Sequence, residues 1–268
     1  MRQLALALAD GGVVAKRNLI KIKRVPEVLI WTTMSPIMFV LLFAYVFGSS
    51  IDIAGDTSYR EYLIAGVFAQ TVIFGSTFTG AGLAEDMTKG VIDRFRSLPM
   101  ARSAVLVGRT ASDVFYNSTS IVVMSITGLI VGWRIHTGVV EALGGFLLLL
   151  LFAYAFSWIM AFVGLKVGSV EMVNNASFMF IFPLTFIANT FVEVQRLPGP
   201  LETFGEWNPV SAVAQAVREA FGNTSNVAPD AWSLQNPILY SLIWVAIILA
   251  VFIPLSVRQY LKAAARQG

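Results

Sequence analysis

Six long apolar stretches constrain the fold of this 268-residue chain more than any other feature. Each has about the 20 residues that an α-helix needs to cross the ~30 Å hydrocarbon core of a bilayer. They cover residues 28–48, 62–84, 111–133, 143–167, 172–192 and 237–257. Only 13% of the residues are charged, against about 25% in soluble domains. We therefore expect an all-α integral membrane protein with six transmembrane helices in a membrane domain of residues 28–257.

The basic residues indicate how these helices are oriented. Arg60, Arg134, Arg196 and Arg218 lie on one side of the predicted membrane, and all other Lys and Arg residues lie on the opposite side. Cytoplasmic segments carry the excess of positive charge, so we expect both termini in the cytoplasm and the chain in the inner or plasma membrane. Residues 258–268 are then a cytoplasmic tail.

The N-terminal segment, residues 1–27, mixes apolar and basic side chains. Such a segment can lie along the inner membrane surface as a basic helix, and we expect an interfacial helix here. Its amphipathic pattern is poor, which leaves a plain cytoplasmic lead-in as the alternative.

The composition excludes several kinds of chemistry. The chain has no cysteine and a single histidine, His136, which excludes thiolate sites and nearly excludes histidine-based metal or nucleophile sites. It has no G-x-x-x-x-G-K-[ST] loop for phosphates, and its net charge of +3 is too small to indicate nucleic acid binding. Few ionisable groups lie within the spans; Asp113, near the start of the third, is expected to pair with Arg109 or another loop cation. We expect a protein that is not an enzyme and takes its energy from elsewhere.

A polar loop of residues 85–109 joins the second and third stretches. Its apolar residues recur at helical spacing, which predicts a short amphipathic helix that protrudes into the cytoplasm and ends at a proline. These residues are Met87, Val91, Phe95 and Leu98, followed by Pro99. Periodicity alone does not distinguish a helix that docks a partner from a solvated helix at the membrane surface.

Three sequence blocks resemble type-2 ABC exporter permeases, and among them the daunorubicin-resistance subfamily. The blocks are GVIDRFRSLPMARSAVLVGR at 90–109, NNASFMFIFPLTFIANTF at 174–191, and LP at 197–198 followed by WNPVSAVAQAVR at 207–218. They occur in the order found in the family, within a six-span layout that covers the whole chain.

The resemblance implies the membrane subunit of an ATP-driven exporter. Such a subunit works with a second permease copy or a paralogue, and with two copies of a separate ABC ATPase that binds ATP and Mg; this chain itself would bind no cofactor. Residues 1–27 would be the connecting helix, and the loop would hold the coupling helix that contacts the ATPase. The coupling residues would be Glu85, Asp86, Lys89, Gly90, Asp93, Arg94, Phe95, Arg96, Leu98, Pro99 and Arg102.

Two helical faces are candidates for a substrate path. The second span has Gln70, Phe74 and Thr77 on one face, and the fifth has Asn175, Phe178, Met179, Phe182, Phe186 and Asn189. Aromatic rings and Met offer large, adaptable apolar area, which suits a hydrophobic or amphipathic molecule. Ordinary helix packing is the alternative. In the permeases that the chain resembles, spans two and five face the centre of the dimer, which favours a path.

The external segment of residues 193–236 contains several prolines and is no single helix. After the turn signal Asn208-Pro209, residues 210–221 have helical propensity but are too few to cross the membrane. We expect a re-entrant helix with Asn208 and Pro209 at an external gate; a surface helix is the alternative.

The resulting prediction is export of a drug, natural product or lipid. A permease for a glycan or lipid-linked polymer is one alternative, and a polytopic membrane scaffold without an ATPase partner is another.

Overall fold

The computed structural model describes residues 26–47, 58–91, 104–224 and 229–266. Every regular element in these residues is helical. The long elements are α2 (Pro26–Leu41), its π-helical continuation η1 (Leu42–Phe47), α3 (Tyr59–Gly75), α4 (Thr77–Thr88), α6 (Ala104–Val131), α7 (Val139–Val167), α8 (Val170–Phe186) and α12 (Pro237–Arg266). The short elements are η2 (Val194–Arg196), α9 (Pro200–Glu206), α10 (Pro209–Phe221) and α11 (Trp232–Gln235).

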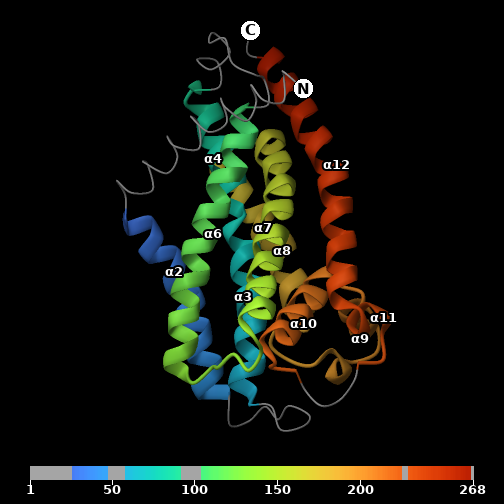
Figure 1. Ribbon diagram of the computed structural model, residues 1–268. Coiled ribbons are helices and arrows are strands. Elements are labelled where there is room, and N and C mark those ends of the chain that lie inside the picture. The colour runs from blue at the N-terminus through green and yellow to red at the C-terminus, as the bar shows by residue number, and fades with distance from the viewer. Residues whose placement is uncertain (1–25, 48–57, 92–103, 225–228, 267–268) are drawn as a thin grey trace.

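The long helices run side by side along one axis, and the short ones gather at one end (Figure 1). Helices α9, α10 and α11 lie at the lower end of the view, whereas α4 ends, α6 begins and α12 ends toward the upper end. The end of α4, the start of α6 and the end of α12 are therefore at the same end of the bundle, opposite the segment that the sequence predicts to be external.

Four described helices are long and apolar enough to cross a membrane: Tyr59–Thr88, Val105–Val131, Val139–Val167 and Pro237–Lys262. They correspond to the predicted second, third, fourth and sixth spans. The predicted first and fifth spans, residues 28–48 and 172–192, fall on α2 with η1 and on α8, which are helical but shorter. The all-helical architecture with apolar spans is confirmed, and the count of six crossings stays a prediction.

The structure corrects the predicted start of the cytoplasmic helix near Glu85. Helix α4 continues the second span as far as Thr88, and Lys89 is its C-cap. Gly90 then has a φ of 64°, a conformation that glycine adopts readily and that commonly ends helices. Met87 therefore does not share one continuous helix with the apolar residues after Gly90. Residues 92–103, which include Phe95 and Leu98 of the predicted stripe, lie outside the described residues.

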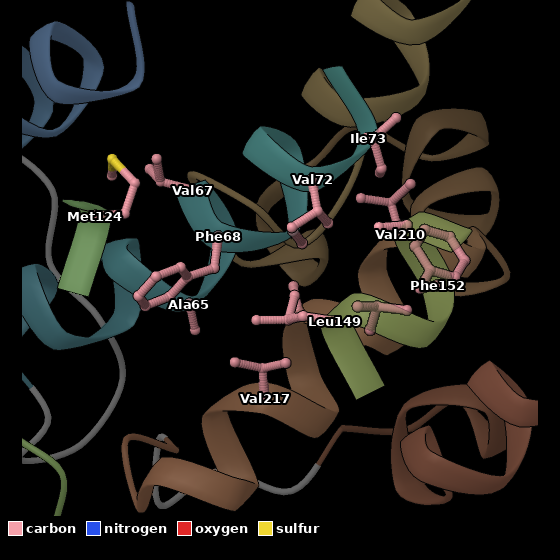
Figure 2. Packing of buried hydrophobic residues seen from close by; sticks show 14 of the residues in the cluster. Ala65, Val67, Phe68, Val72, Ile73, Met124, Leu149, Phe152, Val210 and Val217 are labelled. Carbon is pink, nitrogen blue, oxygen red and sulfur yellow. The ribbon is translucent and has the colours of Figure 1, made fainter. Parts of the chain in front are cut away.

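Helix α3 is the centre of the packing. Nearly all of its residues are buried, because α6, α7 and α10 surround it. Figure 2 shows Phe68 and Val72 of α3 meeting Leu149 of α7 and Val217 of α10. Lipid is as apolar as these side chains, so such helices are held together by close packing rather than by expulsion of water.

Glycines allow the closest of these contacts. A Cβ on Gly164 of α7 would overlap the carbonyl oxygen of Gly80 in α4. A Cβ on Gly66 of α3 would overlap the carbonyl oxygen of Thr190. In both places two backbones touch with no side chain between them, so any larger residue must push the elements apart.

We predict that Gly164→Ala destabilises the bundle by roughly 1–3 kcal/mol, the usual cost of overpacking. Gly144 provides the control, because it lies in the same helix and a Cβ added there would meet no neighbouring segment within 4 Å. In thermal unfolding of detergent-purified protein, Gly164→Ala should lower Tm and Gly144→Ala should not. Equal Tm values for the two variants would contradict the close contact of α4 and α7.

Candidate functional site

A cavity of about 260 Å³ lies between α2, α3, α4, α6 and α8. Its wall combines aromatic rings with hydroxyl and amide groups, the mixture expected where a small apolar molecule is held and oriented. The lining residues are Ser35, Pro36, Phe39, Gln70, Thr71, Phe74, Gly75, Thr77, Phe78, Tyr116, Ser120, Phe178 and Phe182.

The two helical faces proposed from the sequence meet at this cavity. Gln70, Phe74 and Thr77 line it from α3 and α4, and Phe178 and Phe182 line it from α8. Segments that lie far apart in the chain thus contribute to the wall of one cavity.

The other candidate path residues lie elsewhere. Phe186 stacks on Phe182 with ring centroids 4.0 Å apart, just beyond the cavity. Asn175 and Met179 are exposed on α8, Met179 by 71%, and do not line the cavity. Asn189 is not on the α8 face at all, because that helix ends at Phe186.

Sequence reasoning missed the contributions of α2 and α6 to the wall. Ser35 and Pro36 of α2 and Tyr116 and Ser120 of α6 all line the cavity. A signal was present in each case: Ser-Pro inside an apolar helix, and two polar residues four positions apart in the third span, which places them on one helical face.

The cavity lies beside Ser76, the residue that links α3 to α4 within the second span and keeps right-handed helical angles. Ser76 separates α3 from α4, and its backbone N–H donates to Val72 O at 3.2 Å and to Ile73 O at 3.1 Å. Its hydroxyl lies 2.9 Å from Val72 O and 3.0 Å from Ala153 O of α7, both of which can accept its hydrogen bond. Glycine–serine pairs and hydroxyls that bond back to the preceding turn both bend helices. Gly75 and Thr77, on either side of Ser76, line the cavity.

A row of phenylalanine rings continues from the cavity along α8. Phe178 stacks on Phe182 with centroids 4.9 Å apart, and Phe186 lies 4.9 Å from Phe191. Phe191 in turn stacks at 4.6 Å on Phe43 of η1. These contacts join α8 to the first span through aromatic surface.

Asn208, one of the two predicted gate residues, joins the end of α8 to the start of α10. Its Oδ1 accepts a hydrogen bond from Val210 N at 2.9 Å, and its Nδ2 donates to Leu184 O at 2.7 Å and Ile187 O at 3.3 Å. The side chain thus caps an N-terminus and satisfies carbonyls at a C-terminus at the same time. Pro209 occupies the first turn of α10, where its missing N–H costs nothing.

Arg218, in the last turn of α10, is completely buried. Its Nε donates to Tyr62 O at 3.0 Å, and its Nη2 donates to Asn189 O at 2.6 Å and Thr190 O at 3.3 Å. Its guanidinium lies 3.5 Å from the centroid of the Tyr62 ring, and the Tyr62 hydroxyl donates to Asn189 Oδ1. One side chain thus joins α10, α3 and the segment after α8. The count of basic residues by side places Arg218 only as an external charge, although a lone arginine in an apolar helix signals a buried partner.

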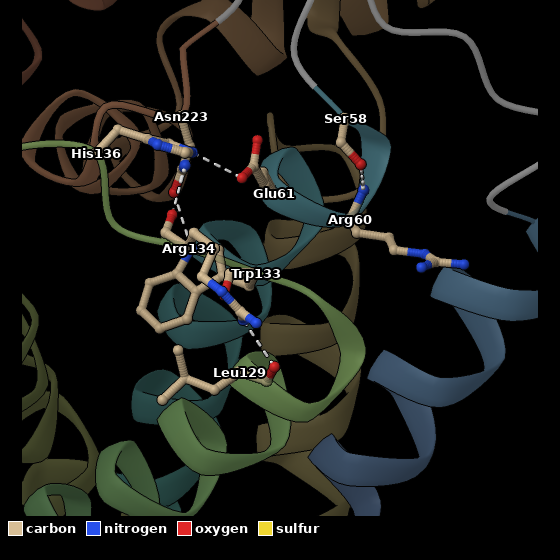
Figure 3. Close-up of polar contacts among 8 residues, drawn as sticks. All are labelled: Ser58, Arg60, Glu61, Leu129, Trp133, Arg134, His136 and Asn223. Atoms are coloured by element: carbon tan, nitrogen blue, oxygen red, sulfur yellow. Dashed lines mark hydrogen bonds and ion pairs between the residues drawn. The ribbon is translucent and has the colours of Figure 1, made fainter.

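A second set of polar contacts closes the same end of the bundle (Figure 3). His136 Nε2 lies 2.8 Å from Glu61 Oε1, so the turn after α6 is held to the start of α3. Asn223, after α10, accepts from Trp133 Nε1 at 2.8 Å and donates to Arg134 O at 2.9 Å. Side chains therefore connect segments at this end of the bundle that are far apart in the sequence.

The predicted coupling residues divide into two groups. Glu85, Asp86, Lys89 and Gly90 lie at the end of α4, where Lys89 Nζ is 2.6 Å from Glu85 Oε1. This hydrogen bond raises the pKa of the Lys89 ammonium above its usual value. Asp93, Arg94, Phe95, Arg96, Leu98, Pro99 and Arg102 lie outside the described residues.

Comparisons with known proteins agree with this architecture. Residues 11–221 match the family described as ABC-2 type transporter. The daunorubicin resistance ABC transporter permease protein DrrB1 of Streptomyces coeruleorubidus is 32% identical over 244 residues, which are 91% of this chain and 83% of that protein. The doxorubicin resistance ABC transporter permease protein DrrB of Mycobacterium tuberculosis is 26% identical over 212 residues, which are 77% of this chain and 71% of that protein.

The family match extends over most of the chain and includes the cavity-lining helices α2, α3, α4, α6 and α8. The relatives are permease subunits of ABC transporters, and apolar helices long enough to cross a membrane are what such a subunit requires. This protein therefore belongs to the ABC-2 type transporter family.

Proposed function

We propose that this chain is the permease subunit of an ATP-driven exporter that moves a hydrophobic or amphipathic molecule out of the cytoplasm. The observation that carries the proposal is the cavity at which two faces selected from the sequence meet. In this proposal the chain crosses the cell membrane six times, both termini are cytoplasmic, and α9 to α11 lie outside with Asn208 and Pro209 at the external gate.

The energy comes from a partner. The chain has no phosphate-binding loop sequence, and the family to which it belongs pairs permeases with an ATPase subunit. In our proposal, two copies of that ATPase bind ATP and Mg and contact the loop of residues 85–109. A second permease copy or a paralogue completes the transporter.

The cavity wall favours a small substrate with both apolar and polar groups. Five phenylalanine rings in the wall offer stacking surface. Gln70 and Ser120 offer polar groups for hydrogen bonds. The rings are those of Phe39, Phe74, Phe78, Phe178 and Phe182. Two relatives are named for resistance to daunorubicin and doxorubicin, which supports a drug or natural product as cargo. A volume of about 260 Å³ argues against a glycan or lipid-linked polymer as the first choice.

Transport requires only that the substrate binds two states of the protein with different affinity. ATP binding to the partner favours one state, and release of the hydrolysis products favours the other. No covalent step on this chain is needed.

We predict that Phe182→Ala weakens binding of doxorubicin, for which one relative is named, because it removes a cavity ring that stacks on two neighbours. A stacked pair contributes about 0.5–1.5 kcal/mol beyond its buried area, so Kd should rise by about two- to tenfold. Fluorescence titration of the protein in lipid nanodiscs measures Kd. Phe180→Ala is the matched control, since Phe180 is on the same helix, 72% exposed and outside the cavity; equal losses for both would remove the cavity from the path.

We predict that Phe95→Asp uncouples transport, because a charge on the apolar stripe of the loop would weaken docking on the ATPase. ATP-dependent export from membrane vesicles should fall and less ATPase should co-purify, while the amount of permease in the membrane stays the same. Phe204→Asp, on the exposed surface of α9 at the opposite end, should leave docking intact. Normal export by Phe95→Asp would contradict the coupling role of the loop.

A further inference from the structure

A polar row runs along one face of α6 behind the cavity. Arg109, Asp113 and Asn117 are spaced four residues apart, which places them on one side of the helix, and Asp113 and Asn117 are buried. Asn117 Nδ2 donates to Asp113 O at 3.0 Å, and the pairing of Asp113 with Arg109 stays a prediction.

This row faces α3 and α4, the two helices of the second span. Arg109 Nη2 donates to Phe78 O of α4 at 2.9 Å. A Cβ on Gly82 of α4 would overlap Arg109 Nη2, and a Cβ on Gly75 would overlap Asn117 Oδ1. A side chain at Gly75 or Gly82 would therefore displace the polar group that lies across it.

The Arg109 contact is directly connected to the cavity wall. Phe78, whose carbonyl accepts from Arg109, lines the cavity, and its ring lies 4.8 Å from that of Tyr116 of α6, which lines the cavity too. Helices α4 and α6 are thus joined by two adjacent contacts: the hydrogen bond of the Arg109 guanidinium and the packing of the Phe78 and Tyr116 rings. These are also the helices on either side of the loop that we propose as the ATPase contact.

We propose that Arg109 is a positioning residue that fastens α4 to α6 across Gly82, so that a displacement of the loop moves both helices together and reaches the Phe78–Tyr116 wall of the cavity. The inference rests on the proposed function and adds the residue through which movement of the loop reaches the cavity. A guanidinium suits this role because its fixed fork of donors holds one geometry.

Ser76, whose backbone keeps right-handed helical angles but whose N–H is shared between two carbonyls, gives such a unit a place to bend. On its external side, α3 is fixed by Arg218, which donates to Tyr62 O at 3.0 Å, and by the contact of Gly66 with Thr190. On its cytoplasmic side, α4 is attached to α6 by Arg109. Residues on both sides of Ser76 line the cavity. Bending of the helix at Ser76 therefore changes the shape of the cavity.

Two substitutions on different helices test the fastening. Gly82→Ala places a methyl group where the guanidinium lies, and Arg109→Leu removes the guanidinium without adding an atom to α4. In proteoliposomes with the ATPase partner, both should lower the molecules exported per ATP hydrolysed by about tenfold, within the range for coupling between two sites, while hydrolysis continues. Gly144→Ala, with open space around it, should leave the ratio unchanged.

A distance measurement separates transmission from a purely structural role. The chain has no cysteine of its own, so nitroxide labels can be attached at Thr88→Cys and Ala111→Cys, which are exposed on α4 and α6. With Arg109 and Gly82 intact, the distance between the labels should be the same with and without trapped ATP; with Arg109→Leu it should change on trapping.

The outcomes distinguish this inference from the proposed function. If the wild-type complex exports nothing with an ATPase partner, the proposed function is wrong. If the wild type exports and both variants keep its ratio of export to hydrolysis, or if the label distance changes in the intact protein, the function stands and the role of Arg109 is overturned.

Discussion

The hydrogen bonds of the buried Arg218 guanidinium are the interaction on which the end of the bundle around α10 depends. Backbone groups cannot go without hydrogen bonds in a membrane, and non-helical chain is tolerated there only where protein satisfies it. The segment after α8 leaves the helix at Phe186, and the carbonyls of Asn189 and Thr190 accept hydrogen bonds from Arg218. These hydrogen bonds satisfy the chain where α8 ends and hold α10 against the bundle. The same segment contacts α3 at Gly66, where no side chain intervenes.

Toward the middle of the second span, the cavity lies beside Ser76, the residue between α3 and α4. Aromatic and polar side chains from both sides of Ser76 line the space. The rings of α8 extend this surface toward Phe191 and Phe43. Toward the other end of the bundle, glycine allows close contacts at Gly80 and Gly82 of α4, as it does at Gly66 of α3.

Hydropathy predicted most of the helices, because crossing a bilayer requires long apolar runs whatever the contacts between them. It also placed Gln70, Phe74, Phe178 and Phe182 on the faces that meet. It did not predict that α4 ends before Gly90 or that Asn189 lies beyond α8, since helix ends depend on single backbone conformations. Long-range polar contacts were missed for another reason: nothing local in the sequence pairs Arg218 with Tyr62, 156 positions away, or Arg109 with Gly82.

We propose that this chain is a passive membrane subunit driven by a separate ATPase. Reconstitution tests it most directly: the purified chain is placed in liposomes with and without the ATPase subunit, and ATP hydrolysis and accumulation of doxorubicin are measured together. The account predicts neither activity from the chain alone and both when the partner is present. ATP hydrolysis by the chain alone, or accumulation that proceeds without ATP, would contradict it.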